Sequence, residues 1–153
     1  MEMHSPKNNS VEILLVEDNL ADIRFTFEAL KESNLVNNIS VVSNGVEAIS
    51  FLKREGKYTD SPQPDFILLD IDLPKKNGHE VLENIRSDIK LKNIPVAVLT
   101  SSKDIYDISR AYKNHVNGYI VKKPNLKELS HDIECFYGFS LLTHRNNKRK
   151  KNI

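Results

Sequence analysis

Cysteine, long apolar runs and an N-terminal hydrophobic segment are what this sequence most clearly lacks. Its single cysteine, Cys135, excludes an internal disulfide framework and a cysteine-rich zinc site. Apolar runs such as Phe66–Leu69 and Pro95–Leu99 are far shorter than the roughly 20 residues that a membrane span needs. Residues 1–10 are polar and carry no hydrophobic region of a secretory signal. We therefore expect a cytoplasmic protein with no membrane partner.

The composition that is present is that of an ordinary single domain. The 153 residues include 39% hydrophobic and 28% charged side chains, and the formal net charge is +1. Five basic residues and no acidic ones lie in the last ten positions, so 17 basic residues face 21 acidic ones elsewhere. We expect a disordered N-terminus over residues 1–10, one folded domain over 11–138 and a basic C-terminal tail over 139–153. Without interleaved aromatic residues this tail is a weak nucleic-acid signal, and a solvated terminus is favoured.

Short apolar runs alternate with amphipathic stretches five times along the chain. The runs, which predict strands, are Val11–Val16, Ile39–Val42, Phe66–Leu69, Ile94–Leu99 and Gly118–Val121. Most of them do not alternate with polar residues, which is typical of strands buried on both faces of a parallel sheet. Between them, spacings of three and four, as in Leu20, Ile23 and Phe27, predict helices. The pattern therefore predicts an α/β fold, a doubly wound five-stranded parallel sheet with helices on both faces.

Polar and charged residues follow these runs at the points where the strands should end. They are Glu17 and Asp18 after the first run, Asp70 and Asp72 after the third, Thr100 after the fourth and Lys122 after the fifth. Because the carboxyl ends of parallel strands lie at one edge of a sheet, we expect these groups to lie close together there.

That set of groups suits phosphoryl transfer. Crowded carboxylates repel one another unless a proton or a cation intervenes, and an all-oxygen ligand set suits Mg²⁺. A carboxylate can attack phosphorus to form an aspartyl phosphate, while a lysine and a hydroxyl interact with the phosphoryl oxygens. Each residue alone also has a structural interpretation, since acidic residues are common at turns and helix N-termini. The functional interpretation depends on all of them falling directly after predicted strands.

These segments resemble the receiver domains of bacterial and archaeal two-component response regulators. The resemblance is carried, in the family's order, by Ile13–Asn19, Asp65–Gly78, Ile94–Ser102 and Gly118–Lys122, and it spans about residues 11–137. The insert Lys53–Pro64 and the segment Leu73–Gly78 are most similar to small single-domain regulators paired with phytochrome-type sensor kinases. The resemblance implies a flavodoxin-like sheet with strand order 2-1-3-4-5. It also implies a stand-alone receiver, because only sixteen residues follow position 137.

The resemblance assigns roles to the acidic residues. It implies that Asp70 is phosphorylated by a phosphohistidine of a sensor histidine kinase. Asp18 and Asp70 would bind Mg²⁺ directly, Glu17 through water and Asp72 through its backbone carbonyl. The protein would then be a signalling phosphoacceptor that assists its own phosphorylation and slow dephosphorylation, and not an enzyme acting on a separate substrate.

The same resemblance assigns Thr100 and Lys122 to contacts with the phosphoryl group and makes Tyr119 change rotamer together with Thr100. The family's usual Lys-Pro pair is here Lys122-Lys123-Pro124, so either lysine could touch the phosphate; the spacing from Tyr119 favours Lys122. The output would be a protein surface recognised by a downstream protein, or transfer of the phosphoryl group to another histidine. Apolar residues between 136 and 142 would belong to the core or to a homodimer contact.

Three alternatives use parts of the same pattern. A haloacid-dehalogenase-type phosphohydrolase would use Asp70 as nucleophile, but its Asp-x-Asp pattern belongs on the first strand and needs a cap domain. A flavodoxin-like cofactor binder is disfavoured because the turn Glu17–Leu20 is acidic and lacks glycine. A regulator that signals without phosphorylation, through a tail bound to nucleic acid, is the third.

Overall fold

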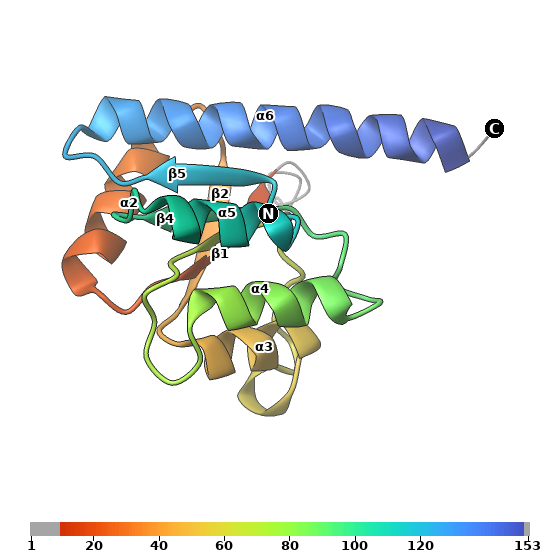
Figure 1. The fold of residues 1–153 in the computed structure, drawn as a ribbon. Coiled ribbons are helices and arrows are strands. Elements are labelled where there is room, and N and C mark those ends of the chain that lie inside the picture. The colour runs from red at the N-terminus through yellow and green to blue at the C-terminus, as the bar shows by residue number, and fades with distance from the viewer. Residues whose placement is uncertain (1–9, 152–153) are drawn as a thin grey trace, which may run out of the picture.

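Five short strands pair into one parallel sheet in the computed structural model, which describes residues 10–151 (Figure 1). The strands are β1 (Val11–Val16), β2 (Asn37–Val42), β3 (Phe66–Leu69), β4 (Val96–Thr100) and β5 (Gly118–Val121). Their order, β2-β1-β3-β4-β5, confirms the predicted fold class and strand order. Because the chain reverses its direction of travel across the sheet between β1 and β3, the carboxyl ends of these two strands form the switch point.

Five α-helices and a 3-10 turn connect the strands and cover both faces of the sheet (Figure 1). They are α2 (Leu20–Glu32), α3 (Gly45–Lys53), η1 (Gly56–Tyr58), α4 (Gly78–Ser87), α5 (Ile105–Lys113) and α6 (Leu126–Lys151). Helices α2 and α6 contribute to one hydrophobic core, and α3, α4 and α5 contribute to the other.

The central strands β1, β3 and β4 form where they do because each of their faces meets a separate core. In β1, Leu14 and Val16 belong to the core under α3, α4 and α5, whereas Ile13 and Leu15 belong to the core under α2 and α6. All four side chains are at most 1% exposed. An uninterrupted apolar run is therefore what this sheet requires, as expected for parallel strands covered on both sides.

The last helix differs from the predicted organisation of the chain. We expected a basic tail from residue 139, but α6 continues to Lys151 and projects past the end of the sheet (Figure 1). The predicted disordered N-terminus falls outside the described residues except for Ser10. Within the described part of the chain, no helix is both long and apolar enough to cross a lipid bilayer.

Candidate functional site

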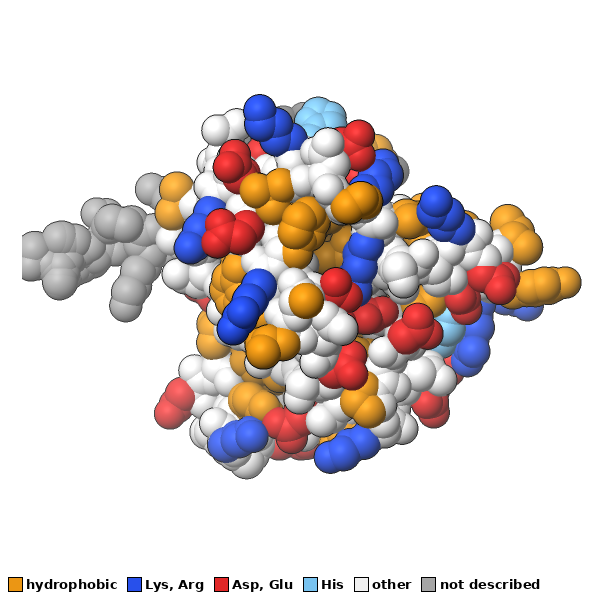
Figure 2. Space-filling view, turned by 90° about the vertical axis from the view of Figure 1, so that its left-hand side faces the viewer, with side chains coloured by type: hydrophobic (Ala, Val, Ile, Leu, Met, Phe, Trp, Pro, Cys, Tyr) orange, Lys and Arg blue, Asp and Glu red, His pale blue; other side chains and the backbone are white. Residues whose placement is uncertain are grey.

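The carboxyl ends of β1, β3, β4 and β5 bring the predicted residues to one edge of the sheet. Glu17 and Asp18 follow β1, Asp70 follows β3, Thr100 ends β4 and Lys122 follows β5. Figure 2 faces this edge of the molecule and shows acidic side chains gathered near its centre. The segments that we expected to converge from separate parts of the sequence therefore do converge.

Three carboxylates form the acidic group of this edge. Glu17, Asp18 and Asp70 each offer one oxygen, and these oxygens lie within 4.8 Å of one another. Glu17 and Asp70 are 1% and 6% exposed, whereas Asp18 faces solvent. A group of oxygen ligands open to solvent on one side suits a divalent cation that keeps part of its water shell.

The pKa of Glu17 reflects the burial of this carboxylate and the charges beside it. Burial raises the pKa of Glu17 to about 7. The Lys122 hydrogen bond offsets part of this effect, and the negative charge of Asp70 adds to it. The remaining oxygen, Glu17 Oε2, accepts a hydrogen bond from the Asn19 backbone N–H at 3.2 Å. A cation bound here would favour the ionised carboxylate and so lower the pKa of Glu17.

Lys122 is the lysine of the site, and Lys123 is not. The Lys122 ammonium lies 2.7 Å from Glu17 Oε1, 2.8 Å from Asp22 Oδ2 and 3.5 Å from Asp70 Oδ2. Burial alone would lower the pKa of Lys122, but the hydrogen bonds to Asp22 and Glu17 and the nearby negative charges outweigh burial and raise it. Lys123 instead points to Asp132 on α6, with 3.8 Å between the charged atoms.

Asp22 belongs to this charge cluster and the sequence did not point to it. It lies in the first turn of α2, where its backbone N–H donates to the Asn19 side chain at 2.9 Å. An acidic residue in a first helical turn is common for reasons of helix stability alone. Its position at the start of the helix that follows Glu17 and Asp18 was the available signal.

Asp72 lies beside the acidic group but is not one of its members. Its side chain is exposed, and its backbone N–H donates to Asp70 Oδ1 at 3.1 Å. This hydrogen bond fixes the orientation of the Asp70 carboxylate. The predicted ligand from Asp72 was its backbone carbonyl, which stays a prediction.

The loop after Asp70 depends on close packing at Gly78. A Cβ atom at this position would lie 2.4 Å from the Asp70 carbonyl oxygen, so only glycine fits without a shift of the backbone. The Gly78 N–H also donates to the Ile71 carbonyl at 3.0 Å. Asn77, the residue before Gly78, forms a capping box with Glu80 at the start of α4.

Thr100 and Tyr119 lie on neighbouring strands and share a contact with the loop after β4. Thr100 is fully buried, and its Oγ1 faces the Ser102 backbone N–H at 3.4 Å. Tyr119 is half-buried, and its hydroxyl donates to the Ser102 carbonyl at 3.0 Å. Burial raises the pKa of Tyr119. The two predicted switch residues therefore both contact the backbone of Ser102.

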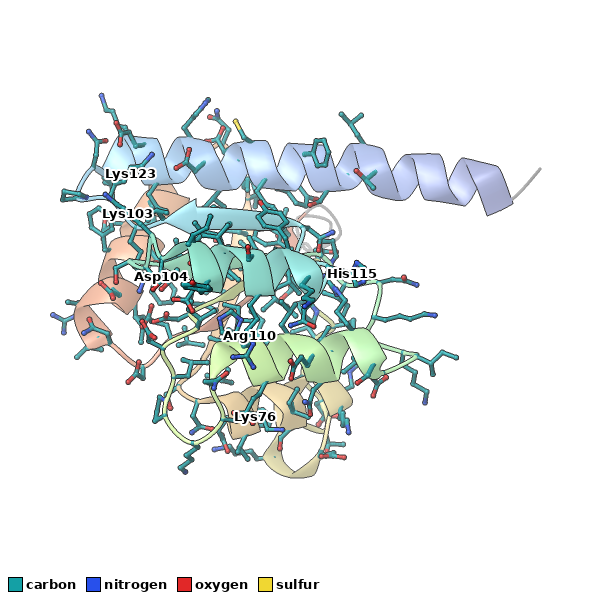
Figure 3. All side chains as sticks on the ribbon, in the orientation of Figure 1. Lys76, Lys103, Asp104, Arg110, His115 and Lys123 are labelled. Atoms are coloured by element: carbon teal, nitrogen blue, oxygen red, sulfur yellow. The ribbon has the colours of Figure 1, made fainter. Side chains whose placement is uncertain are left out.

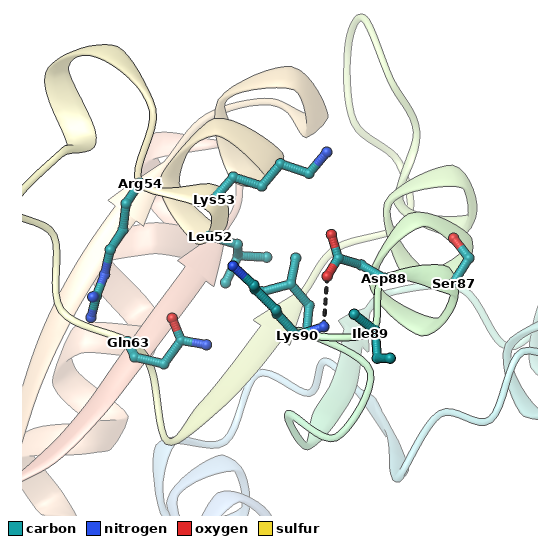
Figure 4. A pocket seen from close by; sticks show the side chains of 9 residues that line it. Leu52, Lys53, Arg54, Gln63, Ser87, Asp88, Ile89 and Lys90 are labelled. Carbon is teal, nitrogen blue, oxygen red and sulfur yellow. Dashed lines mark hydrogen bonds between the residues drawn. The ribbon is translucent and has the colours of Figure 1, made fainter.

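A hollow of about 750 Å³ lies elsewhere, at the C-terminal ends of α3 and α4 (Figure 4). Lys53, Arg54 and Lys90 surround it, and Leu52 and Leu91 contribute its buried side chains. It contains none of the residues that follow the strand carboxyl ends. The acidic group is therefore separate from this hollow.

Comparisons with known proteins agree with this geometry. Residues 13–134 match the model of the response regulator receiver domain. The response regulator Rcp1 of Synechocystis sp. is 43% identical over 141 residues, which cover 92% of this chain and 96% of that protein.

Two solved structures are similar to this chain over most of its length. The phosphorylated cyanobacterial phytochrome response regulator RcpA is similar with a TM-score of 0.78 and 46% identity, over 88% of this chain and 96% of that one. The Mn²⁺-bound form of Rcp1 is similar with a TM-score of 0.73 and 44% identity, over 84% and 90%.

Proposed function

Because the chain belongs to the family of response regulator receiver domains, we propose that it works as a stand-alone receiver whose Asp70 accepts a phosphoryl group. The donor is a phosphohistidine of a sensor histidine kinase. The observation that carries the proposal is the convergence of three carboxylates with the Lys122 ammonium at one sheet edge. The phosphohydrolase alternative gains no support, since the Asp-x-Asp segment that suggested it lies within the matched receiver region.

Transfer to Asp70 needs a carboxylate oxygen that can reach phosphorus. One Asp70 oxygen forms the new P–O bond while the P–N bond breaks, and the donor histidine nitrogen keeps the electron pair. The Lys122 ammonium, 3.5 Å from Asp70 Oδ2, offsets negative charge on the phosphoryl oxygens. The Thr100 hydroxyl donates a hydrogen bond to one of those oxygens.

The metal that we propose is Mg²⁺. Receiver domains bind a divalent metal at their acidic group, and the similar structure of Rcp1 is a Mn²⁺-bound form. Glu17, Asp18 and Asp70 would hold the ion, with Asp72 contributing its backbone carbonyl. When bound, Mg²⁺ supplies positive charge to the carboxylates and to the phosphoryl oxygens. The raised pKa of Glu17, caused first by burial and then by the nearby Asp70, is consistent with this assignment, because a bound cation would favour the ionised carboxylate.

Phosphorylation would act as a switch through charge. It adds close to −2 at neutral pH, and the phosphoryl oxygens attract the Thr100 hydroxyl. Movement of Thr100 leaves space that Tyr119 fills, and the surface above β5 changes with it. The protein assists its own phosphorylation and its slow dephosphorylation, and it turns over no separate substrate.

The partners that we propose follow from the family and from α6. A phytochrome-type sensor kinase supplies the phosphoryl group, and a downstream protein or a second phosphotransfer histidine receives the signal. A homodimer contact fits α6, where Phe139 and Leu142 are 66% and 62% exposed. We propose residues 11–138 as the receiver, a cytoplasmic location, and neither membrane nor nucleic acid as partner.

A phosphorylation assay tests the proposal. Incubation with acetyl phosphate and Mg²⁺ should add one phosphoryl group by intact mass, and a chelator should prevent this. Asp70→Asn should abolish the addition, whereas Asp65→Asn, at the exposed residue that precedes β3, should leave it unchanged. Unchanged uptake by Asp70→Asn would contradict the acceptor assignment, and sustained release of phosphate from small phosphate esters would favour the phosphohydrolase.

A further inference from the structure

His79 is a buried imidazole that the proposed phosphotransfer does not use. It lies in the first turn of α4 and is 5% exposed. Its Nε2 lies 3.2 Å from Asp107 Oδ1 on α5. Its Nδ1 is the one buried side-chain nitrogen or oxygen without a hydrogen-bond partner among the described residues. A buried polar ring with an unpaired atom needs an explanation, since such atoms reduce stability.

The other oxygen of Asp107 connects His79 to the loop after β4. Ser102 Oγ donates to Asp107 Oδ2 at 2.7 Å, and the same Oγ accepts from the Asp104 backbone N–H at 3.2 Å. The Ser102 carbonyl accepts a hydrogen bond from the Tyr119 hydroxyl. The Ser102 backbone N–H faces Thr100 Oγ1. One carboxylate therefore connects α4 to the segment that contacts both switch residues.

The opposite end of this chain of contacts reaches the phosphoacceptor loop. Gly78, the residue before His79, packs directly against the Asp70 carbonyl. A shift of the loop after Asp70 is therefore transmitted to His79 through one peptide bond. The contacts His79–Asp107–Ser102 then join the loop after β3 to the loop after β4.

The ionisation of Asp107 determines which ring nitrogen of His79 carries the hydrogen. The Ser102 hydrogen bond and the His79 interaction lower the pKa of Asp107 and outweigh its partial burial, so Asp107 is an ionised acceptor. His79 must therefore carry its hydrogen on Nε2 and donate it to Asp107. A ring turned over would place Cε1 instead of Nε2 opposite Asp107 and lose this hydrogen bond, so Nδ1 stays without a partner among the described residues.

We propose that His79 and Asp107 are positioning residues for phosphotransfer to Asp70. They hold Ser102, and through it the segment 101–104, in the place where Thr100 can meet the phosphoryl group. Phosphorylation would in turn move Tyr119, Asp107 and His79 together. This inference rests on the proposed function, and it adds two residues that touch neither the acidic group nor the phosphoryl group.

Variants separate positioning from simple helix packing. Asp107→Ala and His79→Leu should slow phosphorylation by acetyl phosphate at saturating Mg²⁺ by about fivefold or more. His79→Gln, which keeps a side-chain N–H donor, should restore most of the rate. The Mg²⁺ concentration that gives half the maximal rate should stay within about twofold of wild type, because the acidic group is untouched.

Arg110→Ala provides the matched control. Arg110 (Figure 3) pairs with Glu83 at 3.7 Å across the same two helices, and the two side chains are 48% and 47% exposed. Equal slowing by Arg110→Ala and Asp107→Ala would overturn the inference, since α4–α5 packing alone would then explain both. Wild-type rates in Asp107→Ala would overturn it as well.

A measurement on the wild-type chain needs no variant. The imidazole ¹⁵N signals of His79 should show hydrogen on Nε2 and should shift when beryllium fluoride and Mg²⁺ mimic the phosphoryl group. His115, exposed at the far end of α5, should not shift. A His79 ring unaffected by the mimic would overturn the inference, whereas failure of wild type to be phosphorylated at all would contradict the proposed function instead.

Discussion

Replacing Glu17 by glutamine should stabilise the metal-free protein at pH 8 while weakening its use of Mg²⁺. Glu17 is 1% exposed and lies beside Asp70. Burial, offset in part by Lys122 and reinforced by Asp70, raises its pKa from 4.5 to about 7. Glutamine keeps one oxygen, which can accept from either Lys122 or the Asn19 N–H, but it cannot ionise, so it removes the unfavourable charge and preserves the shape.

The sign and the size of this effect follow from proton linkage. Between pH 4.5 and about 7 the folded chain holds a proton on Glu17 that the unfolded chain has released. The contribution of Glu17 to stability is therefore greatest below pH 4.5, falls through this interval and is level above it. The whole difference is about 3 kcal/mol, and roughly 2 kcal/mol of it is lost between about pH 5 and about pH 8.

Urea denaturation of both proteins with a chelator, at pH 5 and at pH 8, measures this quantity. Wild type should lose about 2 kcal/mol more than Glu17→Gln between the two conditions, since other titrating groups contribute equally to both. Excess Mg²⁺ should remove most of the difference by favouring the ionised carboxylate. Parallel losses in the two proteins, or a less stable variant at pH 8, would refute the assignment of the pKa shift to Glu17.

Two further predictions test individual contacts. Lys122→Ala should slow phosphorylation by acetyl phosphate about 100-fold, whereas Lys123→Ala should leave the time course by intact mass unchanged, and equal effects would contradict the assignment of Lys122. Gly78→Ala should lower the free energy of unfolding by roughly 1–3 kcal/mol, because its Cβ would lie 2.4 Å from the Asp70 carbonyl oxygen. Gly138→Ala, with no atom within 4 Å of the added carbon, should instead stabilise α6 by about 0.5–1 kcal/mol, and thermal melting that ranks the two variants the other way would refute the packing argument.

The central strands were predictable because the side chains on both of their faces are buried. The predicted runs Phe66–Leu69 and Gly118–Val121 coincide with β3 and β5. Strand β2 begins earlier than predicted, at Asn37, because its backbone pairs with Val11 on β1 from that residue onward. Backbone pairing requires no apolar side chain, so the polar start of β2 carried no hydrophobic signal.

The site was predictable only where topology alone determines position. Strand ends meet at one edge whatever the helices do, which is why Asp70 and Lys122 could be placed from the sequence. Asp22 and His79 lie on helices, and their contacts depend on how α2 and α4 pack against the sheet. The length of α6 had a weaker signal: no glycine or proline follows Gly138, so nothing in the sequence ends the helix there.

Lys122 reaches its partners across much of the chain: 105 residues separate it from Glu17 and 52 from Asp70. During synthesis the acidic residues leave the ribosome well before the lysine. A nascent chain that holds only β1 and β3 can close their carboxyl ends only against the repulsion of Glu17 and Asp70. The strand that arrives last carries the compensating cation, so the residue proposed to serve phosphotransfer also favours completion of the sheet over premature closure of its first half.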